Sequence, residues 1–169
     1  MDLRSADGAR VRLRPVGYQL PDATGGYDAN WLIIGGTVDL ANGRTWTFTD
    51  PALLTWEARE LGDWLAEAAH GRVEVVTDDQ AAALPDDDAS HDAAAIFIEP
   101  NLAFSVAGYA GTAPHGVDGT VSLRVHMAYE SAPDWAEDII VELTCPREMV
   151  LRAAQDWNAQ LAAFPRKVP

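Results

Sequence analysis

The residues that could support catalysis or bind a metal do not form a recognisable constellation in this sequence. The four histidines, His70, His91, His115 and His126, lack metal-ligand spacing with one another and with Cys145. The serines lie outside any Gly-x-Ser-x-Gly turn, and no glycine-rich loop precedes a helix in the way that phosphate binding requires. The sequence therefore predicts neither a bound metal nor a cofactor.

Two remaining arrangements have the residue types needed to form a nucleophile or move a proton. Cys145 precedes Pro146 at a strand-to-helix junction, where a helix N-terminus lowers a thiol pKa, but the sequence offers no evident base beside it. We expect a buried, unreactive thiol. Glu57 and Glu60 have the chemistry of an acid–base pair, yet we expect both on the exposed face of a helix. A hydrolase is therefore a third hypothesis, which would need a cleft of converging acids with shifted pKa values.

Charge is distributed unevenly along the chain. Residues 73–146 contain fourteen Asp and Glu residues and one arginine, Arg124, whereas residues 1–72 contain ten acids and seven arginines. This excess argues against a nucleic acid partner, whose phosphates require Lys and Arg. It favours a partner that is itself basic. Codon bias in a GC-rich genome is the alternative source of the acidity.

The densest acidic stretch covers residues 77–92, which contain six aspartates and no base. Like charges at this density resist burial, so we predict an exposed loop that binds the partner. Trp135 follows a Pro-Asp turn and is expected at the surface, where tryptophan is enriched in interfaces. The predicted partner-binding residues are Asp78, Asp79, Asp86, Asp87, Asp88, Asp92 and Trp135. The stretch lacks the ligand order and glycine turn of a calcium loop, so a cation site is disfavoured.

The elements that would position these residues follow from hydrophobic periodicity. Runs of strand-forming residues predict strands at 10–14, 30–40, 44–49, 73–76, 95–98, 102–106, 121–130 and 138–144. Asn42-Gly43 predicts a tight hairpin. Asp50-Pro51 is expected to open a helix over about 51–70, and a second apolar stripe that includes Trp157 predicts a helix over about 146–164.

Strands that arrive in runs, interrupted by two long helices, favour an α+β fold with a mainly antiparallel sheet. We predict a single domain over residues 1–169, without an internal repeat. The sequence has no apolar stretch long enough to cross a membrane and no apolar run near Met1 typical of a signal peptide. With one cysteine, these features favour the cytoplasm.

Several short motifs together resemble a known family. They are Tyr27–Leu32, Asp50–Glu57, Leu61–Leu65, Glu99–Phe104 and Phe164–Arg166. Their order and spacing resemble the WapI-type immunity proteins and related bacterial proteins, over roughly residues 10–166. The resemblance implies a small bacterial protein that neutralises the polymorphic toxin of its own cell, with no catalytic motif. The aspartates at 77–92 lie between the family-like blocks and look like an insertion.

Two functional hypotheses are favoured over a hydrolase. In the first, the chain is a non-enzymatic inhibitor that binds a basic toxin domain through its acidic half, with no nucleic acid or membrane partner. In the alternative, it is a cytoplasmic domain that binds a small ligand near Asp28, Asn30 and Trp31.

Overall fold

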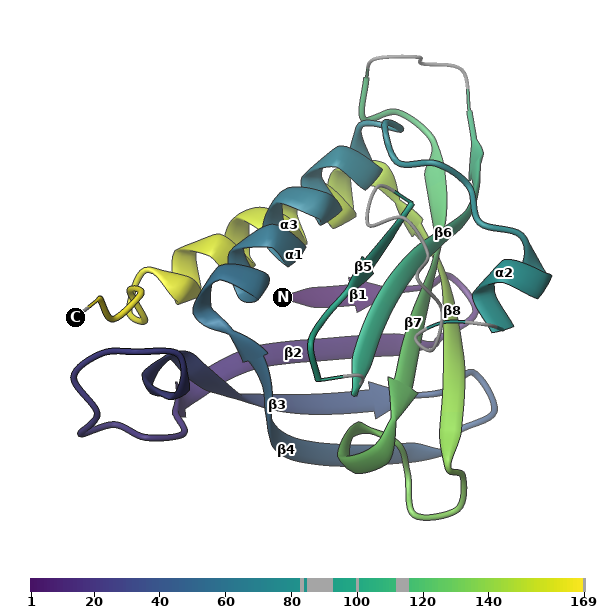
Figure 1. Ribbon diagram of the computed structural model, residues 1–169. Helices are drawn as coiled ribbons and strands as arrows, with labels where there is room; N and C mark the ends of the chain where they lie inside the picture. The colour runs from purple at the N-terminus through teal and green to yellow at the C-terminus, as the bar shows by residue number, and fades with distance from the viewer. Residues whose placement is uncertain (83, 85–92, 100, 112–115, 169) are drawn as a thin grey trace.

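The computed structural model describes residues 1–82, 84, 93–99, 101–111 and 116–168. Within them the chain forms two four-stranded antiparallel sheets and two long helices (Figure 1), which confirms the predicted α+β class. Each half has the same order of elements, namely four strands and then a helix that follows the last strand directly. The topology therefore repeats, although the sequence shows no repeat.

The first sheet consists, in spatial order, of β1 (Asp2–Arg4), β2 (Arg10–Tyr18), β3 (Trp31–Asp39) and β4 (Thr45–Leu54). The short helix η1 (Asp28–Asn30) precedes β3. The predicted Asn42-Gly43 hairpin is confirmed: Gly43 has a φ of 84°, and its N–H donates to the Leu40 carbonyl at 2.9 Å. Positive φ is the backbone conformation that this turn requires of glycine.

The first long helix begins later than predicted. β4 continues through Asp50 and Pro51, which pair with Ile34 and Ile33 of β3, and α1 (Thr55–Ala69) starts only at Thr55. Proline is tolerated here because β4 lies at the edge of the sheet and the register shifts beside it. The interpretation of Asp50-Pro51 as a helix start was therefore wrong.

The second sheet consists of β5 (Ala94–Ile96), β6 (Leu102–Ala110), β7 (Thr120–Ala128) and β8 (Asp138–Pro146), and α3 (Arg147–Leu161) follows it. Two short helices, α2 (Asp78–Ala82) and η2 (Tyr129–Ser131), lie before β5 and after β7. The strand predicted at 73–76 is reduced to one parallel bridge, between Val75 and Val106.

Both sheets and both long helices contribute to one hydrophobic core. α1 and α3 lie side by side, and the strands of the two sheets run at a steep angle to each other (Figure 1). Trp157 is fully buried, as its position on the apolar stripe predicts, and its indole N–H donates to the Ala58 carbonyl at 2.6 Å. The helices approach closely at Gly62, where a Cβ atom would lie 2.1 Å from Oδ1 of Asn158.

Candidate functional site: an acidic face on the second sheet

The outer face of the second sheet carries the polar side chains of β7. Leu123 and Val125 belong to the core, and because side chains alternate along a strand, Arg124 and His126 lie on the opposite face. This face is covered in part by residues 75–82, which include α2. Only 7 % of the Arg124 side chain is therefore exposed, although it lies on the outer face of the sheet.

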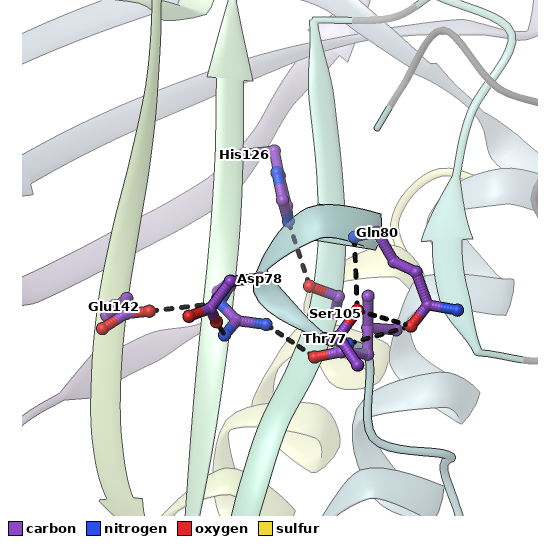
Figure 2. Close-up of polar contacts among 8 residues, drawn as sticks. Thr77, Asp78, Gln80, Ser105, His126 and Glu142 are labelled. Carbon is purple, nitrogen blue, oxygen red and sulfur yellow. Dashed lines mark hydrogen bonds and ion pairs between the residues drawn. The ribbon is translucent and has the colours of Figure 1, made fainter. Parts of the chain in front are cut away.

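Arg124 holds this covering segment against the sheet. Its Nη1 donates to the Val76 carbonyl at 2.8 Å, its Nε donates to Glu142 at 3.1 Å, and its Nη2 donates to the Asp78 carboxylate. Asp78 of α2 and Glu142 of β8 thus converge on the same arginine (Figure 2). The one arginine of residues 73–146 fixes the beginning of the acidic stretch to the strand beneath it.

The structure of α2 explains why this part of the acidic stretch is attached. The side chains of Thr77 and Gln80 form a reciprocal capping box (Figure 2): Thr77 Oγ1 accepts from the Gln80 N–H at 3.3 Å, and Gln80 Oε1 accepts from the Thr77 N–H at 3.0 Å. Val76, Ala81 and Leu84 are buried. Residues 78–82 therefore form a helix rather than a loop; residues 83 and 85–92 of the predicted loop lie outside the described residues.

Ser105 and His126 form a buried hydrogen-bonded pair beside Arg124. Ser105 Oγ lies 3.0 Å from His126 Nε2 (Figure 2), and both residues are buried. Burial, reinforced by the positive charge of Arg124, lowers the pKa of His126 to about 4, so the ring is neutral at pH 7. A serine–histidine pair is the start of a nucleophilic site, but in the described part of the chain no carboxylate is hydrogen-bonded to His126.

The outward side chains of β8 extend this face toward solvent. Asp138, Ile140 and Glu142 pair with Ala128, His126 and Arg124 of β7 and share their outer side. All three are exposed, Glu142 by 67 % of its side chain. The first half of β8 therefore links the β7–β8 connection, at Asp138, with Arg124 and α2, at Glu142.

The connection between β7 and β8 adds aromatic side chains to the acidic ones. Tyr129 is 64 % exposed and has a φ of 50°, which is strained for a residue with a side chain. Trp135 is 48 % exposed; its ring centroid lies 6.0 Å from that of Trp46, and the guanidinium of Arg44 lies 4.8 Å above it. We call the surface formed by α2, β8 and this connection the acidic face. Its exposed members are Asp78, Asp79, Tyr129, Glu130, Asp134, Trp135, Glu137, Asp138, Ile140 and Glu142.

Three of the seven predicted partner-binding residues lie on the acidic face. Asp78, Asp79 and Trp135 all belong to the acidic face, at its two ends. Asp86, Asp87, Asp88 and Asp92 lie outside the described residues. Arg124 offsets part of the charge of Asp78 and Glu142. Among the described residues, the other five carboxylates of the face have no ion-pair partner.

The residues of the alternative ligand hypothesis lie elsewhere, before β3. Asn30 is buried, and its side-chain amide makes four hydrogen bonds within the chain. Nδ2 donates to the carbonyls of Gly26 and Lys167, and Oδ1 accepts from Thr55 Oγ1 at 3.0 Å and from the Lys167 N–H at 2.8 Å. Asn30 thus anchors the end of the chain to the start of α1. Asp28 is exposed and Trp31 is half-buried.

Glu57 was expected to be exposed, and this expectation was wrong. Its side chain is buried and caps α1, since it accepts from the backbone N–H of Leu54 at 2.7 Å and from that of Ile98 at 2.8 Å. Burial raises the pKa of Glu57, and Glu60 and Glu99 add to this effect. Glu60 is exposed as expected. The helix therefore uses this carboxylate to satisfy its first turn and to hold the residues after β5.

Cys145 is buried, as predicted. Burial raises the pKa of its thiol to about 11, so it is protonated at pH 7. Across the described residues, no group of three or more His, Cys, Asp and Glu side chains is arranged to hold a metal ion. In the same part of the chain, no helix has the length and apolar character needed to span a bilayer.

Sequence reasoning missed Arg124, Tyr129 and the Ser105–His126 pair. Arg124 carried a signal, because it is the single base among fourteen acids and sits at an outward position of the most regular strand. The pairing of Ser105 with His126 depends on strand register, which neighbouring residues do not encode.

The chain belongs to the WapI-like family of immunity proteins, whose family model matches residues 2–165. This confirms the resemblance drawn from the short motifs. No curated protein matches the chain.

Proposed function

We propose that this chain is a non-enzymatic, cytoplasmic immunity protein that binds and neutralises the basic toxin domain of a polymorphic toxin. Membership of the immunity family supports a protective role with a protein partner. The basic character of that partner is inferred from the acidic face.

The observation that carries this proposal is the composition of the acidic face. It combines seven exposed carboxylates with two exposed aromatic rings; Arg124 is buried beneath it, and the exposed Arg44 stacks on Trp135 at one end. A field of one sign accelerates encounter with a partner of opposite sign and discriminates against other partners. Tyr and Trp supply the large contact area that dominates binding energy in interfaces.

The mode of neutralisation follows from the same surface. A toxin that acts on an anionic substrate needs a basic cleft, and an acidic face competes with that substrate for the same positive charges. Neutralisation of this kind requires occupancy and no turnover. Complete inhibition is then reached at a fixed ratio of inhibitor to toxin.

The test is a titration of the purified toxin domain encoded beside this chain, followed by calorimetry and by the toxin's own activity. We expect saturable binding with complete inhibition at a fixed ratio. Affinity should weaken by about tenfold or more when ionic strength rises from about 0.05 to about 0.5 M. The absence of association between the two folded proteins, or inhibition that continues at a substoichiometric ratio, would refute the proposal.

A further inference from the structure

A broad hollow crosses the outer face of the first sheet. It has a volume of about 910 Å³, a size typical of sites that hold small molecules. Its floor is the middle of β2, β3 and β4, at residues 12–14, 35–37 and 47–49. Leu13 and Phe48 belong to the core, so the side chains that alternate with them face outward into the hollow. Exposed residues of α3, which contacts β1 and β2, bound its other side.

The outward side chains form two rows across the three strands. In the strand register, the rows are Arg12, Thr37 and Thr47, and Arg14, Gly35 and Thr49. Gly35 leaves a gap in the second row, and the Arg14 side chain lies across it: Nε of Arg14 is 3.5 Å from the place that a Cβ atom of residue 35 would take. Arg14 therefore extends over β3, toward the threonines of β4.

Arg12 and Arg14 have charges that the protein itself does not neutralise. The chain has 26 acids and 12 bases, so an arginine without a carboxylate partner is unexpected. Both arginines are exposed, and among the described residues neither forms an ion pair or stacks on a ring. Asp2 lies opposite Arg12 in the register, but its carboxylate accepts from Arg4 at 2.9 Å and from Arg10 at 2.6 Å. Two adjacent guanidiniums are therefore left to attract an anion.

The donors of the hollow fit a phosphate group. A guanidinium presents a planar fork of N–H groups that matches two phosphate oxygens, and hydroxyl groups donate to the others. Thr45 Oγ1 contacts Val38 and Asp39 of its own chain, whereas the hydroxyls of Thr47 and Thr49 have no hydrogen-bond partner in the described part of the chain. These hydroxyls are therefore available beside the two arginines.

The rim of the hollow selects a compact anion over a long one. Asp2 and Asp156 line it, and the chain has a net charge of −14, so a polyanion that extended past the arginines would be repelled. Hydroxyl groups are the better match for this rim, because carboxylates accept hydrogen bonds from them. Gln160 adds an acceptor, since its Nε2 donates to the Asp156 carbonyl at 3.2 Å and leaves its oxygen free.

We propose that this hollow binds a small phosphorylated sugar or polyol. Its phosphate lies between Arg12 and Arg14, near the threonine hydroxyls of β4, and its own hydroxyl groups face Asp156 and Gln160. The hollow belongs to the first sheet and the acidic face to the second, so this proposal stands independently of the toxin proposal.

The test is an NMR titration of the full-length, ¹⁵N-labelled chain with ribose 5-phosphate, in a phosphate-free buffer at an ionic strength of about 0.05 M. We expect saturable shifts in the amides of residues 12–14, 35–37 and 47–49. Ribose should produce no saturable shift, and inorganic phosphate should bind about threefold or more weakly than ribose 5-phosphate. No saturable shift with ribose 5-phosphate, or shifts confined to other residues, would overturn the proposal. Equal affinity for inorganic phosphate would also overturn it and reduce the hollow to an adventitious ion site.

A single-stranded hexathymidylate separates a site for a compact phosphate from a surface for nucleic acid. At equal phosphate concentration, it should not displace ribose 5-phosphate, because its further phosphates meet the carboxylates of the rim. Displacement by the oligonucleotide would contradict the proposed ligand.

Three arginine variants supply the matched comparison. Arg12→Met and Arg14→Met should each weaken ribose 5-phosphate about tenfold, because each removes charged donors to the phosphate. Arg59→Met removes the same charge from an exposed position of α1 outside the hollow, where Arg59 has no ion-pair partner among the described residues, and should leave the affinity unchanged. Equal effects of the three variants would show attraction by net charge and contradict a site in the hollow.

Thr49→Val tests the hydroxyl contribution without changing charge. Valine keeps the branched shape of threonine on the strand and removes its hydroxyl, so the fold should be retained and binding should weaken about threefold. Unchanged affinity would contradict a phosphate placed beside β4.

Discussion

The two sheets share one topology, but their outward side chains differ in charge. On the first sheet, the outward positions of β2 are Arg10, Arg12 and Arg14, and those of β4 are Thr45, Thr47 and Thr49. On the second sheet, the outward side is acidic along β8 and is covered near β6 and β7 by α2 and the residues before it. The inward positions are apolar in both sheets, whereas the outward positions differ: on the second sheet Arg124 of β7 holds α2, and the outward side chains of β8 are exposed.

The first way to test this comparison is to remove the arginine beneath the acidic face. Arg124→Met leaves the Val76 carbonyl without its donor and releases Asp78 and Glu142. We expect the free energy of unfolding to fall by about 1–2 kcal/mol, because the Val76 carbonyl loses a charged hydrogen-bond donor, whereas Asp78 and Glu142 stay in contact with solvent. Urea denaturation measures the change.

The matched control is Arg12→Met on the first sheet. Arg12 is exposed and, among the described residues, has no ion-pair partner, so this variant should cost less than about 0.5 kcal/mol. Equal losses for Arg12→Met and Arg124→Met would contradict the view that Arg124 anchors the covering segment.

The second prediction concerns pH, because the second sheet buries a histidine on its outer side. The folded-state pKa of His126, about 4, lies below its ordinary value of 6.5. The unfolded chain therefore binds the proton more readily, and stability is lost as the pH falls from about 6.5 toward 4. Between pH 7 and pH 5 the loss from this group should be about 2 kcal/mol.

His126→Gln keeps a hydrogen-bonding partner for Ser105 and cannot be protonated in this range. The variant should therefore lose about 2 kcal/mol less than the wild-type chain between pH 7 and pH 5. Denaturant unfolding at the two pH values measures both losses. An identical pH dependence in the two proteins would show that His126 is not held neutral by its surroundings.

A smaller effect is expected at Tyr129, which is the one described non-glycine residue with positive φ. Its exposed side chain contributes little packing, so Tyr129→Gly should raise the free energy of unfolding by about 1 kcal/mol through relief of backbone strain. The same variant should weaken binding of the toxin domain. Destabilisation would show that the Tyr129 ring packs within the fold and is not held there for a partner.

The parts of the fold that could be predicted from the sequence are those set by local pattern. Periodicity predicted the helices that include Leu61 and Trp157, and Asn42-Gly43 predicted the hairpin between β3 and β4. The interpretation failed where a distant partner decides the conformation. Asp50-Pro51 has the residue types of a helix start, but pairing with β3 keeps it in a strand, and Glu57 is buried because it binds Ile98 from another part of the chain.

The candidate site was predictable to a similar extent. Charge counting located the acidic half, and Trp135 was expected at the surface, where it lies. The β8 side of the face was not predicted, since Asp138 and Glu142 become neighbours of Asp78 only through strand pairing and through Arg124. Long-range register of this kind is not contained in the local pattern.

The central claim is that the acidic face docks the toxin domain, and the most direct measurement is the Kd of that domain for two charge-matched double variants. Glu137→Lys with Asp138→Lys reverses charge on the acidic face, and Asp22→Lys with Asp63→Lys reverses the same charge at exposed positions elsewhere. We expect the first pair to raise Kd by about tenfold or more and the second by less than about threefold. Equal Kd values for the two double variants would contradict the claim.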